Sequence, residues 1–386
     1  MVESAPREIK TLQNLGVVFD NALALEGGHS QSRILFCKDS TGAAVINTLA
    51  ARVRERENIT MHENAHLLEL IKKGGFFAAN IDNEYYSANN VILAAGGIGG
   101  IYSYTTNSPV STGSGIYFAY KLGAKIKDIS LVQFHPTAFA GEESRERFLI
   151  SEAVRGEGAR LLNYKHERFT DELAPRDIVS KCILSEQKRT GSNKFYLDIS
   201  HRDGEFIKSR FPNIYEKLLS CGYDMTREPV PVCPCQHYVM GGVEINSFGE
   251  TSVGDLYAAG ECSRTGVHGN NRLASNSLTE TLVFSRRTAE HINQNIKTES
   301  FILPEMQVKS GTDAPDFRAE IQGIMQKCYF VLPDFEEIRK NLPRVKEIMQ
   351  TLESDDYAPS PELTDARAIA TTAYLILKEL FENQDD

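Results

Sequence analysis

The stretch YAAGECSRTGVHGNNRLASNSL, residues 257–278, combines a strand end, a glycine turn, a polar loop and the start of a helix. Residues 256–259 are predicted to form a short buried strand, and residues 275–277 supply N-caps for a helix from about Leu278 to Asn295. The unpaired N–H groups and partial positive charge of a helix start suit an electron-rich oxygen of a phosphate or a flavin ring. Arg272 lies just before this helix, and its planar fork matches the two oxygens of a carboxylate. The stretch therefore predicts a site for anionic groups.

The composition indicates a globular protein of two or three domains. The chain has 386 residues, of which 41% are hydrophobic and 24% charged, a balance that supports a sizeable core. Its net charge of -10 argues against nucleic acid as a partner, because phosphate binding needs a basic face. We expect no membrane partner, since no apolar run could cross a bilayer and Met1 starts no signal-peptide pattern.

The cysteines indicate a reducing compartment. Seven are scattered along the chain without the spacing of a disulfide framework, so we expect reduced thiols in a cytoplasmic protein. Cys233 and Cys235 are separated by one residue, whereas metal-binding pairs usually have two intervening residues and a second pair. We therefore predict no metal site.

Local patterns predict a mixed α/β chain. Its first part should contain a helix between Ser4 and Gly16, strands at 15–20, 59–61, 67–71, 76–81 and 91–95, and helices at 48–57 and after the glycine turn at 111–115. Residues 301–317 should form a linker. Helices should follow around 321–330 and 335–352 and after Thr364, the last with a core-facing stripe of Ile369, Ala373, Ile376 and Leu380.

The glycine pattern of a dinucleotide cradle is absent from the start of the chain. No G-x-G-x-x-G opens it, and Gly97-Ile98-Gly99-Gly100 lacks the third glycine and precedes no obvious helix. We expect this run to be a turn after the strand at 91–95 rather than a pyrophosphate cradle.

The motif HGNNRLASNSL, residues 268–278, resembles the signature of the flavoproteins that include succinate dehydrogenase, fumarate reductase and L-aspartate oxidase. Three further matches, LEGGHSQSRI, QFHPT and LAPRD, extend the resemblance over most of the chain up to about residue 295. It implies an incomplete Rossmann-like FAD-binding domain with an inserted α+β capping domain and a C-terminal helical tail. The expected domains are 1–128 (FAD-binding, first part), 129–238 (capping), 239–300 (FAD-binding, return) and 301–386 (linker and a shortened helical domain).

The resemblance also implies non-covalently bound FAD. In the family, a strand, glycine loop and helix that hold the dinucleotide precede the part matched by the first helix, and we expect the chain to lack them. Glu261 would bind the ribityl chain, and the backbone at Ser277 and Leu278 would face the flavin ring. The family usually has aspartate where this chain has Ser114, so that cofactor contact is altered.

For the substrate, the resemblance implies a pocket that binds a dicarboxylate. His237 and Arg272 would bind one carboxylate, and His135 with Ser151 the other. Arg176 would be the proton shuttle, which requires charged neighbours and a dry pocket. The family commonly has threonine at the position of Ser151, and serine keeps the hydroxyl.

Two places favour the L-aspartate oxidase branch. Glu26 and His29 in EGGHS, and the run RLASNSL, fit that branch better than the dehydrogenases. L-aspartate carries an ammonium group that succinate lacks, and a carboxylate at Glu26 would pair with it. The implied activity is FAD-dependent oxidation of L-aspartate to iminoaspartate with dioxygen or fumarate as acceptor, the first step of de novo NAD biosynthesis, with quinolinate synthase as a possible partner. The alternatives are a fumarate reductase or succinate dehydrogenase flavoprotein subunit, or a catalytically silent dicarboxylate-binding fragment.

Structural roles compete with these functional ones. Arg176 could form a helix-start ion pair with Asp171 or Asp177, and Arg155 could pair with Glu157. Three other histidines are expected to be satisfied core residues: His62, His66 and His166.

Overall fold

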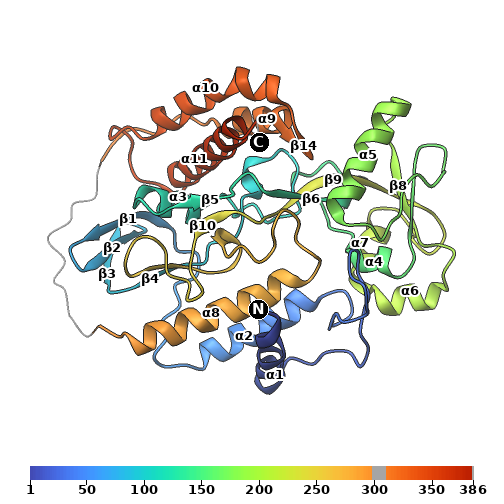
Figure 1. Cartoon of the computed structure of the whole chain (residues 1–386), viewed down its shortest axis with the longest axis horizontal. Coiled ribbons are helices and arrows are strands. Elements are labelled where there is room, and N and C mark those ends of the chain that lie inside the picture. Colours follow the sequence, from blue (N-terminus) through green and yellow to red (C-terminus); the bar gives the residue numbers. More distant parts are fainter. Residues whose placement is uncertain (298–309, 385–386) are drawn as a thin grey trace. The chain divides into compact units, whose positions relative to one another are not determined.

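The computed structural model describes residues 1–297 and 310–384, and its contacts divide the chain into two compact units. The first unit comprises Met1–Met61, Gln133–Gln236 and Asn271–Thr279. The second comprises His62–Val132, His237–Asn270 and Glu280–Asp386. Figure 1 shows the elements of each unit, and they are described separately.

The first unit is built on a four-stranded sheet in the order β6-β9-β8-β7. These strands are β6 (Val132–Phe139), β7 (Arg160–Leu162), β8 (Phe195–Asp198) and β9 (Val230–Val239). Strand β8 pairs antiparallel with both β7 and β9. Helices α4 (Glu152–Gly156), α5 (Arg176–Thr190), α6 (Gly204–Arg210) and α7 (Pro212–Ser220) belong to the same unit (Figure 1).

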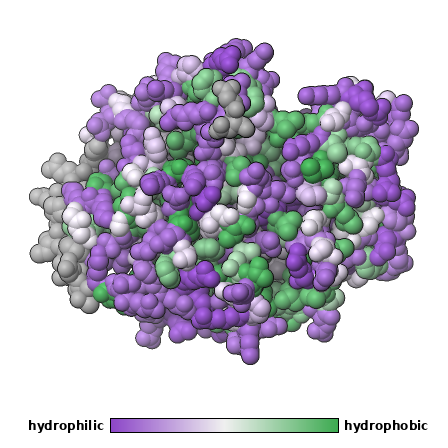
Figure 2. All heavy atoms as spheres, in the orientation of Figure 1, coloured by the Kyte–Doolittle hydropathy of each residue, from purple (hydrophilic) through white to green (hydrophobic). Residues whose placement is uncertain are grey.

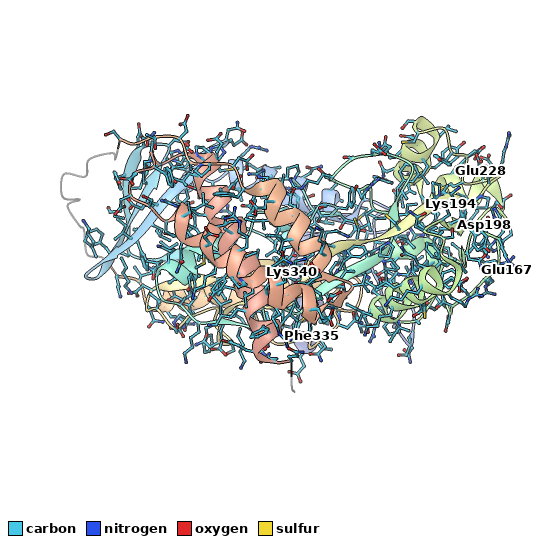
Figure 3. All side chains as sticks on the ribbon, turned by 90° about the horizontal axis from the view of Figure 1, so that it is seen from above. Glu167, Lys194, Asp198, Glu228, Phe335 and Lys340 are labelled. Atoms are coloured by element: carbon cyan, nitrogen blue, oxygen red, sulfur yellow. The ribbon has the colours of Figure 1, made fainter. Side chains whose placement is uncertain are left out.

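Apolar side chains from the sheet and these helices form one core cluster. Val179 and Ile183 of α5 meet Leu197 of β8 and Val230 of β9 in this cluster, and all four are at most 2% exposed. Charged residues lie on the outside, including Glu167, Lys194 and Glu228, which Figure 3 labels. The sheet and helices therefore give the unit a packed interior against which buried polar groups can be held in place.

Two helices of the first unit come from its N-terminal segment. α1 (Ala5–Leu15) confirms the helix predicted between Ser4 and Gly16, and Gly16 ends it with a φ of 115°. α2 (Thr41–Arg54) begins seven residues before the predicted helix at 48–57. We expected Leu49 and Val53 of this helix to face inward, but its buried residue is Val45, and Leu49 and Val53 are half-buried.

The predicted strands at 15–20 and 59–61 are wrong. Residues 17–20 are extended but make only local contacts to a returning segment, such as the bond from Asp20 N to Phe36 O (2.8 Å), and Val18 is 82% exposed. Ile59 and Met61 are 45% and 44% exposed. An apolar run becomes a strand only when a partner strand accepts its backbone hydrogen bonds, and the ladder pairing is missing at both places.

In its described residues the second unit contains four small sheets, one of which is the antiparallel pair of β13 (Tyr329–Phe330) and β14 (Leu332–Pro333). β4 (Val91–Leu93) pairs parallel with β11 (Leu256–Ala258), which confirms the strands predicted at 91–95 and 256–259. β1 (Leu67–Lys73) and β2 (Phe76–Ile81) confirm the strands predicted at 67–71 and 76–81, and they form an antiparallel sheet with a third strand, β3 (Glu84–Ala88). The remaining sheet contains β12 (Ser263–Arg264), β10 (Gly242–Glu244) and β5 (Ile126–Lys127).

Helices of the second unit follow the sequence pattern closely. α3 (Ser114–Lys121) starts after Gly113, whose φ of 83° makes the turn predicted at 111–115. α8 (Asn276–Gln294) matches the helix predicted from about Leu278, and its first four residues are grouped with the first unit. Residues 94–98 form an extended turn that leads into a short 3-10 helix, Gly99–Ile101, so the glycine run is the turn that the sequence predicts.

The C-terminal part contains three helices, α9 (Arg318–Cys328), α10 (Phe335–Leu352) and α11 (Pro361–Glu382). They pack on one another, and α11 also packs on α3 (Figure 1). α11 begins at the cap Ser360, not at Thr364, which lies inside the helix. Ile369, Ala373 and Ile376 are fully buried as predicted, whereas Leu380 is half-buried.

The fold class is the predicted mixed α/β class with open sheets. The domain boundaries at 128, 238 and 300 stay a prediction, and the part of the predicted linker at 301–309 lies outside the described residues. Polar residues cover much of the face seen in Figure 2, in keeping with the charged composition. None of the helices in the described ranges is both long and apolar enough to pass through a bilayer.

Candidate active site

Arg176 begins helix α5 in the interior of the first unit. Pro175 precedes it as the N-cap residue with extended backbone angles, which sets the direction in which the helix starts. The Arg176 side chain is only 7% exposed. Its Nε donates to Glu152 Oε2, and its Nη1 donates to Gln133 Oε1 at 3.0 Å. The guanidinium is therefore held by two partners on different elements.

Glu152 and Arg155 lie one turn apart on the short helix α4, next to Arg176. Arg155 Nη2 is 3.2 Å from Glu152 Oε1, and both side chains are at most 1% exposed. Arg155 Nη1 also donates to the carbonyl of Glu172 at 2.6 Å. The predicted alternatives, Arg176 with Asp171 or Asp177 and Arg155 with Glu157, are wrong because both arginines pair with the more deeply buried Glu152.

The charges around Glu152 decide its protonation state. Burial acts to raise the pKa of this carboxyl, but the charges of Arg176 and Arg155, with the hydrogen bond from Arg176, lower its pKa on balance. Burial lowers the pKa of the Arg155 guanidinium, and the charge of Glu152 acts in the opposite direction. Glu152 is thus an ionised carboxylate between two buried guanidinium groups.

Gly27 allows this network to pack against the N-terminal segment. A Cβ on Gly27 would collide with Glu152 Oε1 and would approach the carbonyl of Ala174 at 3.4 Å. The side chain of Glu152 has no room to retreat, because both its oxygens are engaged with arginines. The glycine in LEGGHS is therefore required by close approach to a buried charge.

Arg272 is tied to the same network through Gln133. Gln133 Nε2 donates to the carbonyl of Arg272 and to Asn271 Oδ1, both at 2.8 Å. Arg272 Nη1 donates to Ser277 Oγ at 3.1 Å. Because Gln133 accepts from Arg176 with its amide oxygen and donates with its amide nitrogen, it links the two arginines directly.

His135 and Ser151 offer two hydrogen-bond donors in the first unit. His135 is fully buried in β6, and its Nδ1 accepts from the backbone N–H of Thr137 at 3.2 Å. In the neutral ring the proton therefore resides on Nε2, an assignment inferred from the hydrogen bonding. Ser151 caps α4, with its Oγ accepting from Ala153 N at 3.3 Å, which leaves the hydroxyl proton to donate elsewhere.

Glu26 is a buried carboxylate on the N-terminal segment of the first unit. It is 8% exposed, and Ser275 Oγ donates to its Oε2 at 2.9 Å. Burial raises the pKa of Glu26, while the hydrogen bond from Ser275 acts to lower that pKa. Glu26, Arg176 and Arg272 thus belong to one compact unit, together with His135 and Ser151.

His237, the remaining predicted substrate residue, belongs to the second unit. Its Nδ1 lies 2.7 Å from Thr106 Oγ1, and Asn107 Nδ2 donates to its backbone carbonyl at 2.8 Å. The ring is half-buried. Two neighbouring polar residues therefore fix both the ring and the backbone of His237 at the end of β9.

The predicted cofactor residues lie at one turn and at two helix starts. Glu261 Oε1 accepts from Val239 N at 3.1 Å, and a Cβ on Gly97 would collide with that carboxylate. Ser114 is the first residue of α3 and half-buried, and Ser277 lies in the first turn of α8. Leu278 is 38% exposed at the start of the same helix. These residues fit FAD.

A second buried cluster in the second unit surrounds Glu280. Tyr238 Oη donates to Glu280 Oε2 at 3.0 Å, His268 Nε2 lies 2.7 Å from the same oxygen, and Thr265 Oγ1 donates to Oε1. His268 is the histidine of the HGNNR motif and is 4% exposed. The cluster anchors the polar loop before Arg272 on the helix that follows.

Sequence reasoning missed two site residues, Gln133 and Glu152, which hold Arg176. Gln133 stands in the QFHPT motif and Glu152 follows Ser151, so proximity to a motif residue was the available signal. The prediction that three histidines are core residues is wrong, because all three are exposed: His62, His66 and His166.

The comparisons with known proteins first define the class. Residues 1–278 match the family model described as the FAD binding domain. A quinol-fumarate reductase structure with menaquinol molecules is similar with a TM-score of 0.87 and 25% identity, covering 100% of this chain and 77% of that one. A Mycobacterium smegmatis Sdh1 structure in complex with UQ1 has a TM-score of 0.77 and 28% identity, covering 100% and 74%. The class is that of FAD-dependent oxidoreductases.

Sequence relatives narrow the class to one branch. The L-aspartate oxidase of Clostridium perfringens is 47% identical over 316 residues, 79% of this chain and 72% of that protein. The L-aspartate oxidase of Yersinia pestis is 36% identical over 418 residues, 98% of this chain and 78% of that protein. The chain belongs to the L-aspartate oxidase family of FAD-binding proteins. The predicted resemblance, FAD cofactor and oxidoreductase class are confirmed.

Proposed function

We propose that this protein oxidises L-aspartate to iminoaspartate, with dioxygen or fumarate reoxidising the flavin. The observation that carries the proposal is the buried network of Glu152, Arg155 and Arg176 in the same unit as the separate carboxylate of Glu26. A site with buried cations suits the two carboxylates of the substrate, and a further acid suits its ammonium group. The reaction would be the first step of NAD biosynthesis, with quinolinate synthase using the product.

The two substrate carboxylates would be bound by different groups of donors. Arg272 and His237 would hold one carboxylate, because the guanidinium fork donates to two oxygens at once. His135, with its Nε2–H, and the Ser151 hydroxyl would hold the other. Each hydrogen bond to a charged group contributes roughly 1.5–3 kcal/mol, so four donors can bind a dianion against its loss of hydration.

Arg176 would move the proton. Its Nε donates to Glu152, and the other oxygen of Glu152 lies 3.2 Å from Arg155. Arg176 would first pass its Nε proton to Glu152 Oε2 and then take the proton that the substrate releases, so that Arg176 ends as a guanidinium again and Glu152 holds the transferred proton. General acid–base transfer by a positioned group typically accelerates a reaction by about 10²–10⁴-fold.

Glu26 would pair with the substrate ammonium. It is buried, and the hydrogen bond that it receives comes from the neutral hydroxyl of Ser275. An ammonium group would supply the positive charge that favours the ionised carboxylate in a buried setting. Succinate and fumarate have no such charge, so this pairing would distinguish L-aspartate from plain dicarboxylates.

FAD, when bound, would accept the hydride that leaves the substrate carbon. Glu261, Ser114 and the α8 start at Ser277 and Leu278 are the residues that would hold it. The chain's own residues would orient the substrate toward the flavin and keep water from the reacting carbon.

The proposal is tested by assaying purified, FAD-saturated protein with L-aspartate, succinate and fumarate side by side. We expect L-aspartate to be oxidised with dioxygen, which is reduced to hydrogen peroxide, and also with fumarate, which is reduced to succinate. Oxidation of succinate without oxidation of L-aspartate would support a succinate dehydrogenase or fumarate reductase subunit instead. An Arg176→Met variant serves as the control for turnover at the proposed site.

A further inference from the structure

Ser275 has an unusual backbone conformation beside the proposed site. Its φ is 65°, in the left-handed region that residues with a Cβ rarely adopt. Asparagine follows it, and α8 begins there. A non-glycine residue in this region persists only when the surrounding structure holds it, and such residues gather at functional sites.

The Ser275 hydroxyl donates to Glu26 Oε2 at 2.9 Å, across 249 positions of sequence. The conformation of Ser275 directs its side chain to the buried carboxylate. The segment that carries Glu26 also approaches the backbone around Ser275 closely, because a Cβ on Gly28 would lie 2.8 Å from the side chain of Leu273. Gly28 has a φ of 75°, so both segments have special backbone conformations where they meet.

His29 forms a second link between the same two segments. Its Nε2 lies 3.1 Å from the carbonyl of Ala274, and its Nδ1 accepts from Arg33 Nε at 2.9 Å. Since a carbonyl only accepts, Nε2 must carry the proton, and Nδ1 is the acceptor. The neutral imidazole therefore fixes Ala274, and with it the position of the next residue, Ser275.

We propose that Ser275 is a specificity-determining positioning residue, which aims the Glu26 carboxylate at the substrate ammonium and so favours an amino dicarboxylate over a plain dicarboxylate. This inference rests on the proposed function. It goes further because it assigns discrimination to a residue that does not touch the substrate and that bonds Glu26 from a left-handed backbone conformation.

The charged groups around Glu26 decide how its ionisation responds to the loss of Ser275. Burial raises the pKa of Glu26 most, and the Ser275 bond lowers it. Glu152 also raises this pKa, whereas Arg176 lowers it, and His29 lowers it only when its ring is protonated. Without the hydroxyl the pKa of Glu26 rises further, so a larger fraction is protonated at a given pH and unable to pair with an ammonium. The acidic limb of L-aspartate oxidation should therefore move to higher pH.

The experiment compares the FAD-saturated parent with Ser275→Ala and Ser275→Gly. Both variants lose the hydroxyl, but glycine adopts a φ of 65° without strain and alanine does not. We expect kcat/KM for L-aspartate to fall by about ten-fold or more in both, mainly through KM, because a hydrogen bond to a charged group is lost. The kinetic constants for fumarate reduction should stay within about two-fold. Ser209→Ala, an exposed serine on α6, controls for purification and folding.

Several outcomes would overturn the inference. Ser275→Gly with normal L-aspartate kinetics and Ser275→Ala without them would show that strain, not the hydroxyl, matters. An equal loss for L-aspartate and fumarate would show a general structural role, and so would an unmoved pH profile. If the parent oxidises L-aspartate and both variants equal it, this inference alone fails. If the parent reduces fumarate but does not oxidise L-aspartate, the proposed function fails and the inference fails with it.

Discussion

Two buried carboxylates of the first unit have opposite electrostatic environments. Glu152 lies between Arg155 and Arg176, and on balance those charges lower its pKa despite burial. Glu26 is hydrogen-bonded by the neutral Ser275, and burial raises its pKa. The comparison teaches that burial alone does not set the charge of an acid, since the surrounding cations decide it. The charge of Glu152 is already balanced by two arginines. Glu26 is bonded by a neutral hydroxyl, which suits it to a cation that arrives with the substrate.

The largest expected effect on turnover comes from removing Arg176, one of the two cations that flank Glu152. Arg176→Ala should lower kcat for L-aspartate about a thousand-fold, because the proposed proton shuttle is lost. It should also lower the free energy of unfolding by about 3–5 kcal/mol, since Glu152 loses one of two buried partners. Turnover assays and denaturant unfolding measure the two effects.

Arg176→Lys is the matched control for the Arg176 prediction. Lysine keeps the charge but not the planar fork that reaches both Glu152 and Gln133. We expect it to restore much of the stability and little of the turnover. Equal turnover in the parent and Arg176→Ala would contradict the assignment of the shuttle.

The second largest effect is expected from removing the carboxylate of Glu26. Glu26→Gln should lower kcat/KM for L-aspartate about 100-fold and leave fumarate reduction within a few-fold, because only L-aspartate carries an ammonium. In the parent, kcat/KM for L-aspartate should fall as the pH falls through the pKa of Glu26, which burial raises above its ordinary value. The sign follows from the carboxylate having to be ionised to bind the ammonium.

The Glu26→Gln variant also tests that pH dependence. Its acidic limb for L-aspartate should lose the contribution of this group, because glutamine does not titrate. Steady-state kinetics at several pH values provide the measurement. A loss of similar size on both substrates would count against the ammonium role.

A smaller effect tests Glu261, a proposed cofactor residue of the second unit. Gly97→Ala should place a Cβ against Glu261 and displace its carboxylate, which is the flexible end of a side chain. We expect the protein to fold and to bind FAD about ten-fold more weakly, measured by flavin fluorescence on titration. Gly42→Ala is the matched control, because a Cβ on Gly42 meets nothing within 4 Å. Unchanged FAD affinity in Gly97→Ala would remove Glu261 from the cofactor site.

The smallest effect is expected at the exposed His166, which serves as a reference for substitutions away from both carboxylates. His166 is exposed and stacks on Tyr196 with ring centroids 5.1 Å apart. His166→Ala should change the free energy of unfolding by no more than about 0.5 kcal/mol, as is usual at the surface, and should leave L-aspartate kinetics unchanged. A large loss of stability would restore the structural role that the sequence suggested for this histidine.

The sequence predicts the regular elements well where the hydrophobic period is long. Residues 335–352 form α10 with the predicted bounds, and 76–81 form β2. The short apolar runs at 15–20 and 59–61 fail because a strand depends on a partner elsewhere in the chain. Local pattern carries helix information, but not the location of the pairing strand.

The site shows the same limit. Motif residues such as His135 and Arg272 are found from the sequence, and they lie in one unit with Arg176. The pairing of Arg176 with Glu152 spans 24 positions and was not predicted. Likewise, Ser275 appears only as a helix cap in the sequence, because its bond to Glu26 and its φ are properties of the folded backbone.

The most direct test of the account is anaerobic reduction of the FAD-saturated parent by L-aspartate, followed as loss of visible flavin absorption. We predict that L-aspartate bleaches the flavin at least about ten-fold faster than succinate at the same concentration, and that Glu26→Gln removes most of this difference. Bleaching by succinate at an equal rate, or a preference for L-aspartate that survives in Glu26→Gln, would contradict the claim that the buried Glu26 carboxylate awaits the substrate ammonium.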